Sequence, residues 1–479
     1  MSKLLTSRQF RYFSINMIVG FGLISTVLSV SNLGGWGFLI ILITGFMTMS
    51  TGFVFSRLAQ KYSETYGGSY AYAREIAYKT KRGKRFKRNF QFFVGWNQFI
   101  QGPILSATTP LFLTGAATVF TQDTTTINIV RIASFVFYII LVLISTFGLK
   151  VNKKVILASA IIKWSTLMLS VFLLLYLAIS DNYFIQNIVY TKDITQGNAQ
   201  YGHVAPYAIF SSIVSFMYAF GGYESLSAMT KDVKTNNFRS ILMGAFWVIL
   251  IFYMLFYLIV FNVNSNLFFS DSSKTKEFSN IFARVWGITG LIIFVIGLVF
   301  NNISSKLSTS YTGARQIVPL AEDGYLPKWV AKRSEKYGEY RNAMWFAVIL
   351  TIVSLITFWI LPTFIPSIHF LFNVINLGTI SFFIQYILTF VTSLILEKQN
   401  RIEKIPLWEK ILYYLGILSM FVVVMVYIFP FFVGQPWTDE NTITLVSFVI
   451  FVGIGYVIYA WVHFGPNHRR HKDVRNWTI

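Results

Sequence analysis

The sequence contains no cysteine and few acidic residues, which narrows the functions open to it. Without cysteine the chain forms no disulfide and performs no thiolate chemistry. Its five histidines fall into no spacing typical of a metal site. The sequence also has no glycine-rich phosphate loop ending in Lys-Ser/Thr and no serine or cysteine triad. We therefore expect a protein that is not an enzyme and needs no cofactor or metal.

Charge is scarce as well, because only 12% of the 479 residues are charged and 55% are hydrophobic. Soluble domains carry about 25% charged residues. Apolar runs of about 20 residues, each long enough to cross a bilayer as a helix, recur along the whole chain. They predict an all-α integral membrane protein with twelve transmembrane helices, the first of them retained rather than cleaved as a signal peptide. The predicted spans are 10–31, 36–57, 90–118, 127–147, 153–180, 205–229, 240–262, 283–307, 342–361, 367–396, 408–431 and 442–464.

Basic residues give the chain a net charge of +21 and occupy alternate loops. About 34 of the 40 Lys and Arg fall in the termini and in segments 57–89, 148–154, 231–239, 306–341 and 398–410. This asymmetry predicts a multi-pass protein of the cell membrane with both termini in the cytoplasm. The densest run, KTKRGKRFKR at 79–88, is interpreted as an orientation signal that also contacts anionic membrane lipids. Basic residues spread over short loops do not form the folded basic face that nucleic acid requires, so no nucleic-acid partner is expected.

Two predicted spans are interrupted by paired glycines, at Gly20 and Gly22 and at Gly221 and Gly222. The second pair lies five spans after the first. Because five helices cross the membrane an odd number of times, the two halves are predicted to form an inverted repeat. Glycine-interrupted helices in corresponding positions of two halves indicate the binding site of a transporter. The alternative is that these glycines only allow close helix packing.

Several motifs, in order along nearly the full chain, resemble those of amino acid permeases of the amino acid–polyamine–organocation (APC) superfamily. The stretch AFGGYESLSAMTKDVK is similar to the family's sixth-helix pattern. The most specific similarity runs from Arg315 to Pro327, where a small-residue and Arg segment leads to Ala-x-Asp-Gly-x-Leu-Pro. A Gly-Gly-x-Tyr motif at Gly67, Gly68 and Tyr70 and a Gly-Trp pair at Gly95 and Trp96 also match.

The resemblance implies a five-plus-five inverted repeat of the LeuT type, with broken helices 1 and 6 and two added C-terminal helices. The transporter core would span 1–396, with repeat one at about 10–180 and repeat two at about 205–396. Residues 397–479 would form two accessory transmembrane helices and a basic cytoplasmic tail. The implied function is secondary active transport of amino acids by alternating access, as proton-coupled symport or as exchange, with the oligomeric state undetermined. A polyamine or other organic cation carrier, and a channel or sensor on the same fold, are the alternatives.

The resemblance also implies where the substrate binds. The substrate carboxylate would lie at the backbone N–H groups of the first break, and the ammonium group at carbonyl groups of the sixth helix. Tyr218 would cover the substrate as a gate. The first break departs from the family pattern because it lacks the small polar residue usual between the glycines. The candidate substrate-binding residues are Val19, Gly20, Phe21, Gly22, Tyr218, Ala219, Phe220 and Gly221.

Two charged residues inside predicted spans are candidates for gating or coupling. Glu224 is the only carboxylate well inside a span, where an acid costs a few kcal/mol. It is interpreted as a structural gating residue, with proton relay and direct substrate contact as alternatives. Lys163 is about 15 Å deep, near the midplane. The resemblance implies that Lys163 replaces the sodium ion of related carriers, as a fixed charge or a proton carrier. The alternative is a static pair with a carbonyl or carboxylate. A hydroxyl cluster at Ser304, Ser305, Ser308 and Thr309 is expected at the inner end of helix eight.

Overall fold

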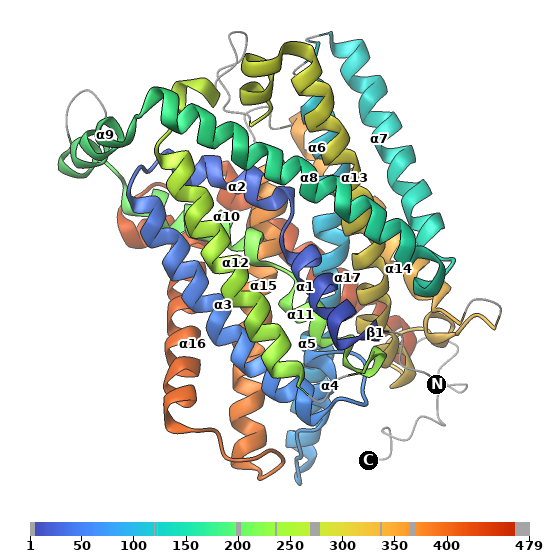
Figure 1. Ribbon diagram of the computed structural model, residues 1–479. Helices are drawn as coiled ribbons and strands as arrows, with labels where there is room; N and C mark the ends of the chain where they lie inside the picture. Colours follow the sequence, from blue (N-terminus) through green and yellow to red (C-terminus); the bar gives the residue numbers. More distant parts are fainter. Residues whose placement is uncertain are drawn as a thin grey trace.

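The protein is a bundle of helices in a computed structural model that describes residues 5–118, 120–121, 123–197, 203–234, 237–268, 278–335, 338–364 and 370–464. In this part of the chain two short strands, β1 (Leu5–Thr6) and β2 (Val233–Lys234), pair in parallel. Figure 1 shows α4 and the connection between α15 and α16 at one end of the bundle, while α9 projects near the other end. The predicted basic tail, 465–479, lies outside the described residues.

The helices follow the predicted order of apolar segments. They are α1 (Ser7–Ile18), α2 (Phe21–Ser31), α3 (Trp36–Lys61), α4 (Ser69–Arg74), α5 (Lys81–Ser106), α6 (Thr108–Thr118), α7 (Thr124–Ser145), α8 (Leu149–Asp181), α9 (Phe184–Gln196), α10 (Pro206–Met217), α11 (Tyr223–Ser227), α12 (Phe238–Phe261), α13 (Ser279–Glu322), α14 (Arg341–Phe364), α15 (Phe370–Lys398), α16 (Leu407–Ile428) and α17 (Asp439–Phe464). Short 3₁₀ turns are η1 (Tyr218–Phe220), η2 (Thr230–Asp232), η3 (Ser265–Phe268), η4 (Lys328–Ala331) and η5 (Pro430–Val433).

Many of these helices are long and apolar enough to cross a membrane. Among the described residues nine meet this test singly, namely α3, α7, α8, α12, α13, α14, α15, α16 and α17. The pair α1 and α2 meets it as one span bent by 41°. The predicted spans 90–118 and 205–229 are divided between α5 and α6 and between α10, η1 and α11. Many side chains on the outside of the bundle are large and apolar, such as Ile179 at 78% exposed, as expected for a surface that faces lipid.

Two predicted loop boundaries are wrong. The segment 306–341 was expected as a cytoplasmic loop, but α13 continues without interruption to Glu322. The hydroxyl cluster at 304–309 therefore lies within α13 rather than at its end. Similarly, most of the basic run at 79–88 is the first part of α5, whose N-cap is Thr80. The predicted helix ends were placed where each apolar run stops. A helix can continue through polar residues when protein surrounds them or when they extend beyond the lipid.

Packing brings the first and second halves of the chain together. Helix α3 packs on α12, α5 packs on α15, and α8 packs on α13. Helix α10 contacts both α2 and α3, and α2 contacts η1. The two interrupted segments, more than 190 residues apart in the sequence, thus become neighbours at the centre of the bundle, as the positions of α1, α2, α10 and α11 in Figure 1 show.

Candidate functional site

The first interruption separates α1 from α2 at Val19 and Gly20. Gly20 is extended, with φ −159° and ψ −168°, a conformation open to any residue. Its lack of a side chain matters for space, because a Cβ there would lie 2.9 Å from Asn301 Oδ1 on α13. A Cβ on Gly22 would lie 3.0 Å from the Tyr218 ring. The glycines therefore let the break approach α13 and the sixth-helix segment closely.

The second interruption follows η1, where Gly221 and Gly222 separate it from α11. Gly222 has φ +122°, a left-handed conformation that strongly favours glycine. A Cβ on Gly221 would meet the Phe382 ring at 2.8 Å, so this position also needs glycine for space. Both predicted breaks are present. Gly222 has a conformational reason to be glycine, whereas Gly20, Gly22 and Gly221 leave room for side chains of neighbouring segments.

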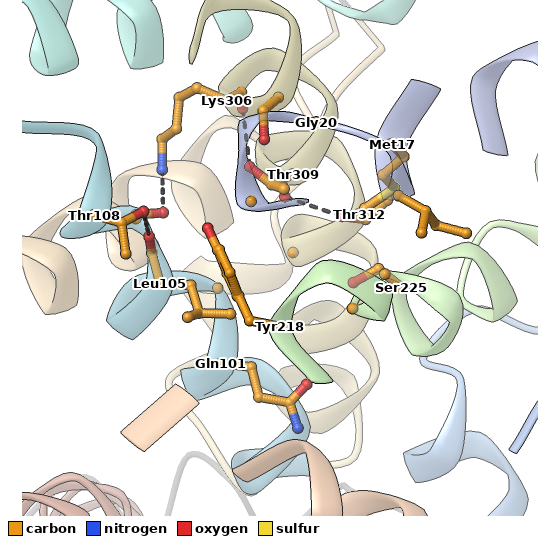
Figure 2. Close-up of a pocket in the computed structure, with 18 of the residues that line it drawn as sticks. Met17, Gly20, Gln101, Leu105, Thr108, Tyr218, Ser225, Lys306, Thr309 and Thr312 are labelled. Atoms are coloured by element: carbon orange, nitrogen blue, oxygen red, sulfur yellow. Dashed lines mark hydrogen bonds between the residues drawn. The ribbon is translucent and has the colours of Figure 1, made fainter. Parts of the chain in front are cut away.

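The two breaks border one cavity of about 140 Å³. Helices α5, α6, α13 and α15 complete its wall, and Figure 2 shows side chains from several of these elements converging on it. Six of the eight predicted substrate-binding residues line the cavity, namely Val19, Gly20, Phe21, Gly22, Tyr218 and Gly221. The predicted gating residue Glu224 also lines it.

Ala219 and Phe220 do not line the cavity. The carbonyl of Ala219 accepts a hydrogen bond of 2.6 Å from the Tyr253 hydroxyl, and Phe220 packs on the Tyr253 and Phe216 rings. Both residues are buried behind the cavity, toward α12. Tyr218 differs, because its side chain extends into the cavity, as Figure 2 shows. The 3₁₀ geometry of η1 sends successive side chains in different directions.

The helix ends at the first break carry opposite partial charges. The first turn of α2 leaves N–H groups without intrahelical partners, and the Phe21 N–H faces Asn301 Oδ1 at 3.4 Å. The C-terminal end of α1 exposes carbonyl groups, which attract a cation. This break therefore offers donors for an anion on one side and acceptors for a cation on the other.

Lys163 occupies the cation position at the end of α1. Its side chain is 2% exposed, and Nζ donates to the carbonyl oxygens of Asn16 and Val19, each at 2.7 Å. No carboxylate pairs with it among the described residues. The contacts join α8 to both sides of the helix end, so the ammonium satisfies carbonyls that the broken helix leaves without partners.

Glu224 stands at the start of α11, directly after the second break. Its carboxylate accepts hydrogen bonds from the Gly222 N–H at 3.2 Å, the Tyr386 hydroxyl at 2.9 Å and the Ser225 hydroxyl at 3.3 Å. An acid near a helix N-terminus satisfies free N–H groups and the helix dipole. The bond to Tyr386 also ties the broken segment to α15.

Sequence reasoning missed several polar residues of the cavity. Lys306 lies where the predicted span 283–307 overlaps the basic segment 306–341 and was counted with that segment, yet it is 8% exposed and lines the cavity from α13. Gln98 and Gln101 on α5 and Asn301 on α13 line it too. The signal that could have revealed Lys306 is the absence of proline and of a glycine pair between 288 and 318, which allows one long helix.

A buried ionic network lies below the cavity, toward the predicted cytoplasmic end. Arg315 on α13 is bonded to Asp232 and lies 3.4 Å from Glu339. Asp232 also accepts a hydrogen bond of 2.7 Å from the Tyr66 hydroxyl, and burial beside this acid raises the pKa of Tyr66. The network joins the loop after α3, the turn after α11, helix α13 and the segment before α14.

We predict that Asp232→Asn destabilises the protein, because it removes one of the carboxylates that compensate a buried guanidinium. Breaking a buried ion pair costs about 3–5 kcal/mol. We expect a clearly lower midpoint of thermal unfolding in detergent. The control is Glu75→Gln, which removes a partly exposed ion pair of 3.8 Å worth about 0–1 kcal/mol. Equal midpoints for the two variants would contradict the prediction.

Comparisons with known proteins agree with this architecture. The sequence pattern of the amino acid permease family matches residues 8–456. The uncharacterized protein MG225 of Mycoplasma genitalium is 32% identical, over 98% of this chain and 96% of that protein. The uncharacterized protein MG226 of the same organism is 31% identical, over 95% of both chains.

Solved structures show the same fold. Crystal structures of two mutants of a manganese transporter from Eremococcus coleocola match with TM-scores of 0.53 and 0.54. The matches cover 96% of this chain and 95% of those chains at 13% and 12% identity. This identity is low enough that the likeness concerns the fold and not the transported substrate. With a family match over most of the chain and the fold of a transporter, this protein belongs to the amino acid permease family and is a multi-pass membrane protein of the APC superfamily.

Proposed function

We propose that the protein is a secondary active transporter that moves amino acids across the cytoplasmic membrane by alternating access, as a proton-coupled symporter or an exchanger. The observation that carries the proposal is the meeting of two helix breaks at one cavity, with Gly22 against the Tyr218 ring and Gly222 against Ile18. Non-helical backbone at membrane depth is tolerated where it lines such a cavity. Breaks in corresponding helices of two repeats mark the binding site of this class of carrier.

The packing of the helices supports the inverted repeat. In an inverted repeat, α5 with α6, α7 and α8 of the first half would correspond to α13, α14 and α15 of the second half. The contact of α8 with α13 then corresponds to the contact of α15 with α5. Likewise, the contact of α7 with α13 corresponds to that of α14 with α5, and the contact of α3 with α12 maps onto itself. This exchange symmetry is what two related halves would produce, and it supports twelve spans in two groups of five with two accessory helices.

The backbone at the breaks suits the two ends that all amino acids share. The substrate carboxylate would lie at the N–H groups of Gly20, Phe21 and Gly22, at the start of α2. The ammonium group would lie near the second break, where Tyr218 and Gly221 line the cavity. Glu224 is the only carboxylate among the described lining residues, and it already accepts three hydrogen bonds. A polyamine would need more free acids than this wall provides.

Lys163 and Glu224 are proposed to hold the two broken segments in the binding-competent arrangement. Lys163 places a positive charge at the end of α1 without a metal ion, which supports transport that needs no sodium. Glu224 fixes the start of α11 against α15 through Tyr386. Both termini are proposed to be cytoplasmic, with the network around Arg315 closing the path on that side.

Reconstitution of the purified protein in liposomes tests the proposed function. Radiolabelled L-amino acids would be supplied one at a time, with and without an inward proton gradient and with and without sodium. We expect saturable uptake that is stereoselective for L-amino acids and is changed little by sodium. Liposomes without protein are the control. Uptake that does not saturate, or competition by polyamines alone, would contradict the proposal.

A further inference from the structure

Lys306 is a buried cation that borders the cavity from α13 and has no carboxylate partner among the described residues. Its Nζ donates to the Ser106 hydroxyl at 2.6 Å and lies 4.3 Å from the centre of the Tyr138 ring. A hydroxyl and a ring face compensate a buried charge only in part. Because an ammonium group in a membrane interior is costly, this position is suited to receive an anion.

Other polar atoms of the same wall also lack partners in the described part of the chain. Both amide atoms of the Gln98 side chain and the Oε1 of Gln101 are buried without a hydrogen bond. Gln101 uses its Nε2 to donate to the Ser381 carbonyl at 3.0 Å. Buried polar groups in proteins nearly always have partners, so these atoms are available to bind a polar ligand in the cavity.

The charges around the cavity are not balanced by a neutral substrate. Lys163 donates a hydrogen bond to Val19 at the first break and Lys306 lies in the wall, whereas Glu224 is the only carboxylate among the described lining residues. A zwitterionic amino acid carries no net charge and leaves one positive charge in excess. An amino acid with an ionised side-chain carboxylate removes this excess.

The position of Lys306 fits a substrate side chain rather than the shared end of an amino acid. Figure 2 shows its side chain extending from α13 toward Thr108, at the junction of α5 and α6, where Ser106 accepts its hydrogen bond. The hydroxyl of Tyr218 points toward the same corner in Figure 2. The second break, near Ser225, lies on the other side of Tyr218 in that view. A substrate held by its backbone groups at the breaks would therefore project its side chain along Tyr218 to Lys306.

We infer that Lys306 binds the side-chain carboxylate of the substrate and that acidic L-amino acids are the preferred substrate class. This inference rests on the proposed function, because it assigns the substrate of the same cavity. Lys306 acts as a specificity residue: it distinguishes a carboxylate from the amide of the same shape, while the helix breaks bind the groups common to all amino acids.

The test compares acids with their isosteric amides in proteoliposomes that contain the full chain. Half-saturating concentrations would be measured for L-aspartate against L-asparagine and for L-glutamate against L-glutamine. We expect the wild-type protein to favour each acid at least about tenfold, as a charge-assisted hydrogen bond gives. Lys306→Met is expected to bring each ratio close to one, and Lys306→Arg to preserve the preference for acids. Lys332→Met, at an exposed lysine after η4, is the control that keeps the wild-type ratio.

The outcomes separate this inference from the function on which it rests. If neutral L-amino acids are taken up and the acids are not favoured over their amides, the carrier function stands and the role of Lys306 is wrong. If Lys306→Met keeps the wild-type ratio, the assignment is also wrong. If no L-amino acid is taken up at all, both proposals fail. Should Lys306→Met not fold, the wild-type ratio of acid to amide still decides the substrate class.

Discussion

Replacing Lys163 by alanine is expected to cause the largest loss of the proposed amino acid uptake. The ammonium group satisfies the carbonyl oxygens of Asn16 and Val19 at the end of α1, so the variant leaves one partly buried and one buried acceptor without this partner. Each such group costs about 1–3 kcal/mol. The combined cost of about 2–6 kcal/mol would fall on the segment that borders the cavity. We therefore expect initial rates of uptake in proteoliposomes to fall at least about thirtyfold.

The matched control is Lys153→Ala, which removes an exposed lysine from the same helix, α8, away from the break. It is expected to transport like the wild-type protein. Lys163→Arg distinguishes a fixed charge at this position from a proton carrier, because arginine supplies a fixed charge but does not release a proton. Uptake that is driven by a proton gradient in the wild type and only exchanges substrate in Lys163→Arg would identify a proton carrier. Uptake that requires sodium and persists in Lys163→Ala would contradict the ion-replacing role.

Replacing Gly222 by alanine is expected to cause the second large loss of uptake. Gly222 has φ +122°, where a side chain is strained by about 1–3 kcal/mol. The added Cβ would also lie 3.3 Å from Ile18 Cγ1, on the other broken helix. Relief of this strain would turn α11 and move Glu224 away from Tyr386. We expect uptake to fall at least about tenfold, with a lower midpoint of thermal unfolding.

Gly244→Ala provides the comparison for this variant. Gly244 lies in α12, and a Cβ there would meet no atom within 4 Å. Alanine in a helix is more favourable than glycine by about 1 kcal/mol, so this variant should be as stable as the wild type or more stable. Gly244→Ala should also transport at the wild-type rate. If Gly222→Ala does the same, the second break is not needed in its present form and the proposed binding site is wrong.

The features that could be predicted from the sequence are those with a local cause. Membrane insertion depends on the hydropathy of about 20 consecutive residues, so the apolar segments and their order were predictable. The interruptions were predictable because the glycines at 20 and 22 and at 221 and 222 sit within apolar runs. Lys163 was recognisable because a cation at that depth is rare.

The ends of helices and the directions of side chains were harder to predict from the sequence. Helix α13 was predicted to end near 307 because the residues that follow are polar, yet these residues face protein, where a polar helix is stable. The same error counted Lys306 with the basic segment 306–341 instead of with the cavity. The resemblance implied that carbonyl groups near Ala219 and Phe220 face the substrate, but the Ala219 carbonyl accepts a hydrogen bond from Tyr253 on α12.

The sequence by itself determined that this protein is a helical membrane protein of the permease family with two interrupted spans, because composition, spacing and motif are properties of short stretches of chain. The tertiary structure decided which groups meet at the cavity. Lys163 and Val19 are 144 residues apart, and Lys306 and Ser106 are 200 residues apart. Such pairs form only when helices that are distant in the sequence pack together. The groups that compensate the charge of a buried lysine are its neighbours in space, and most of them are not its neighbours in the chain.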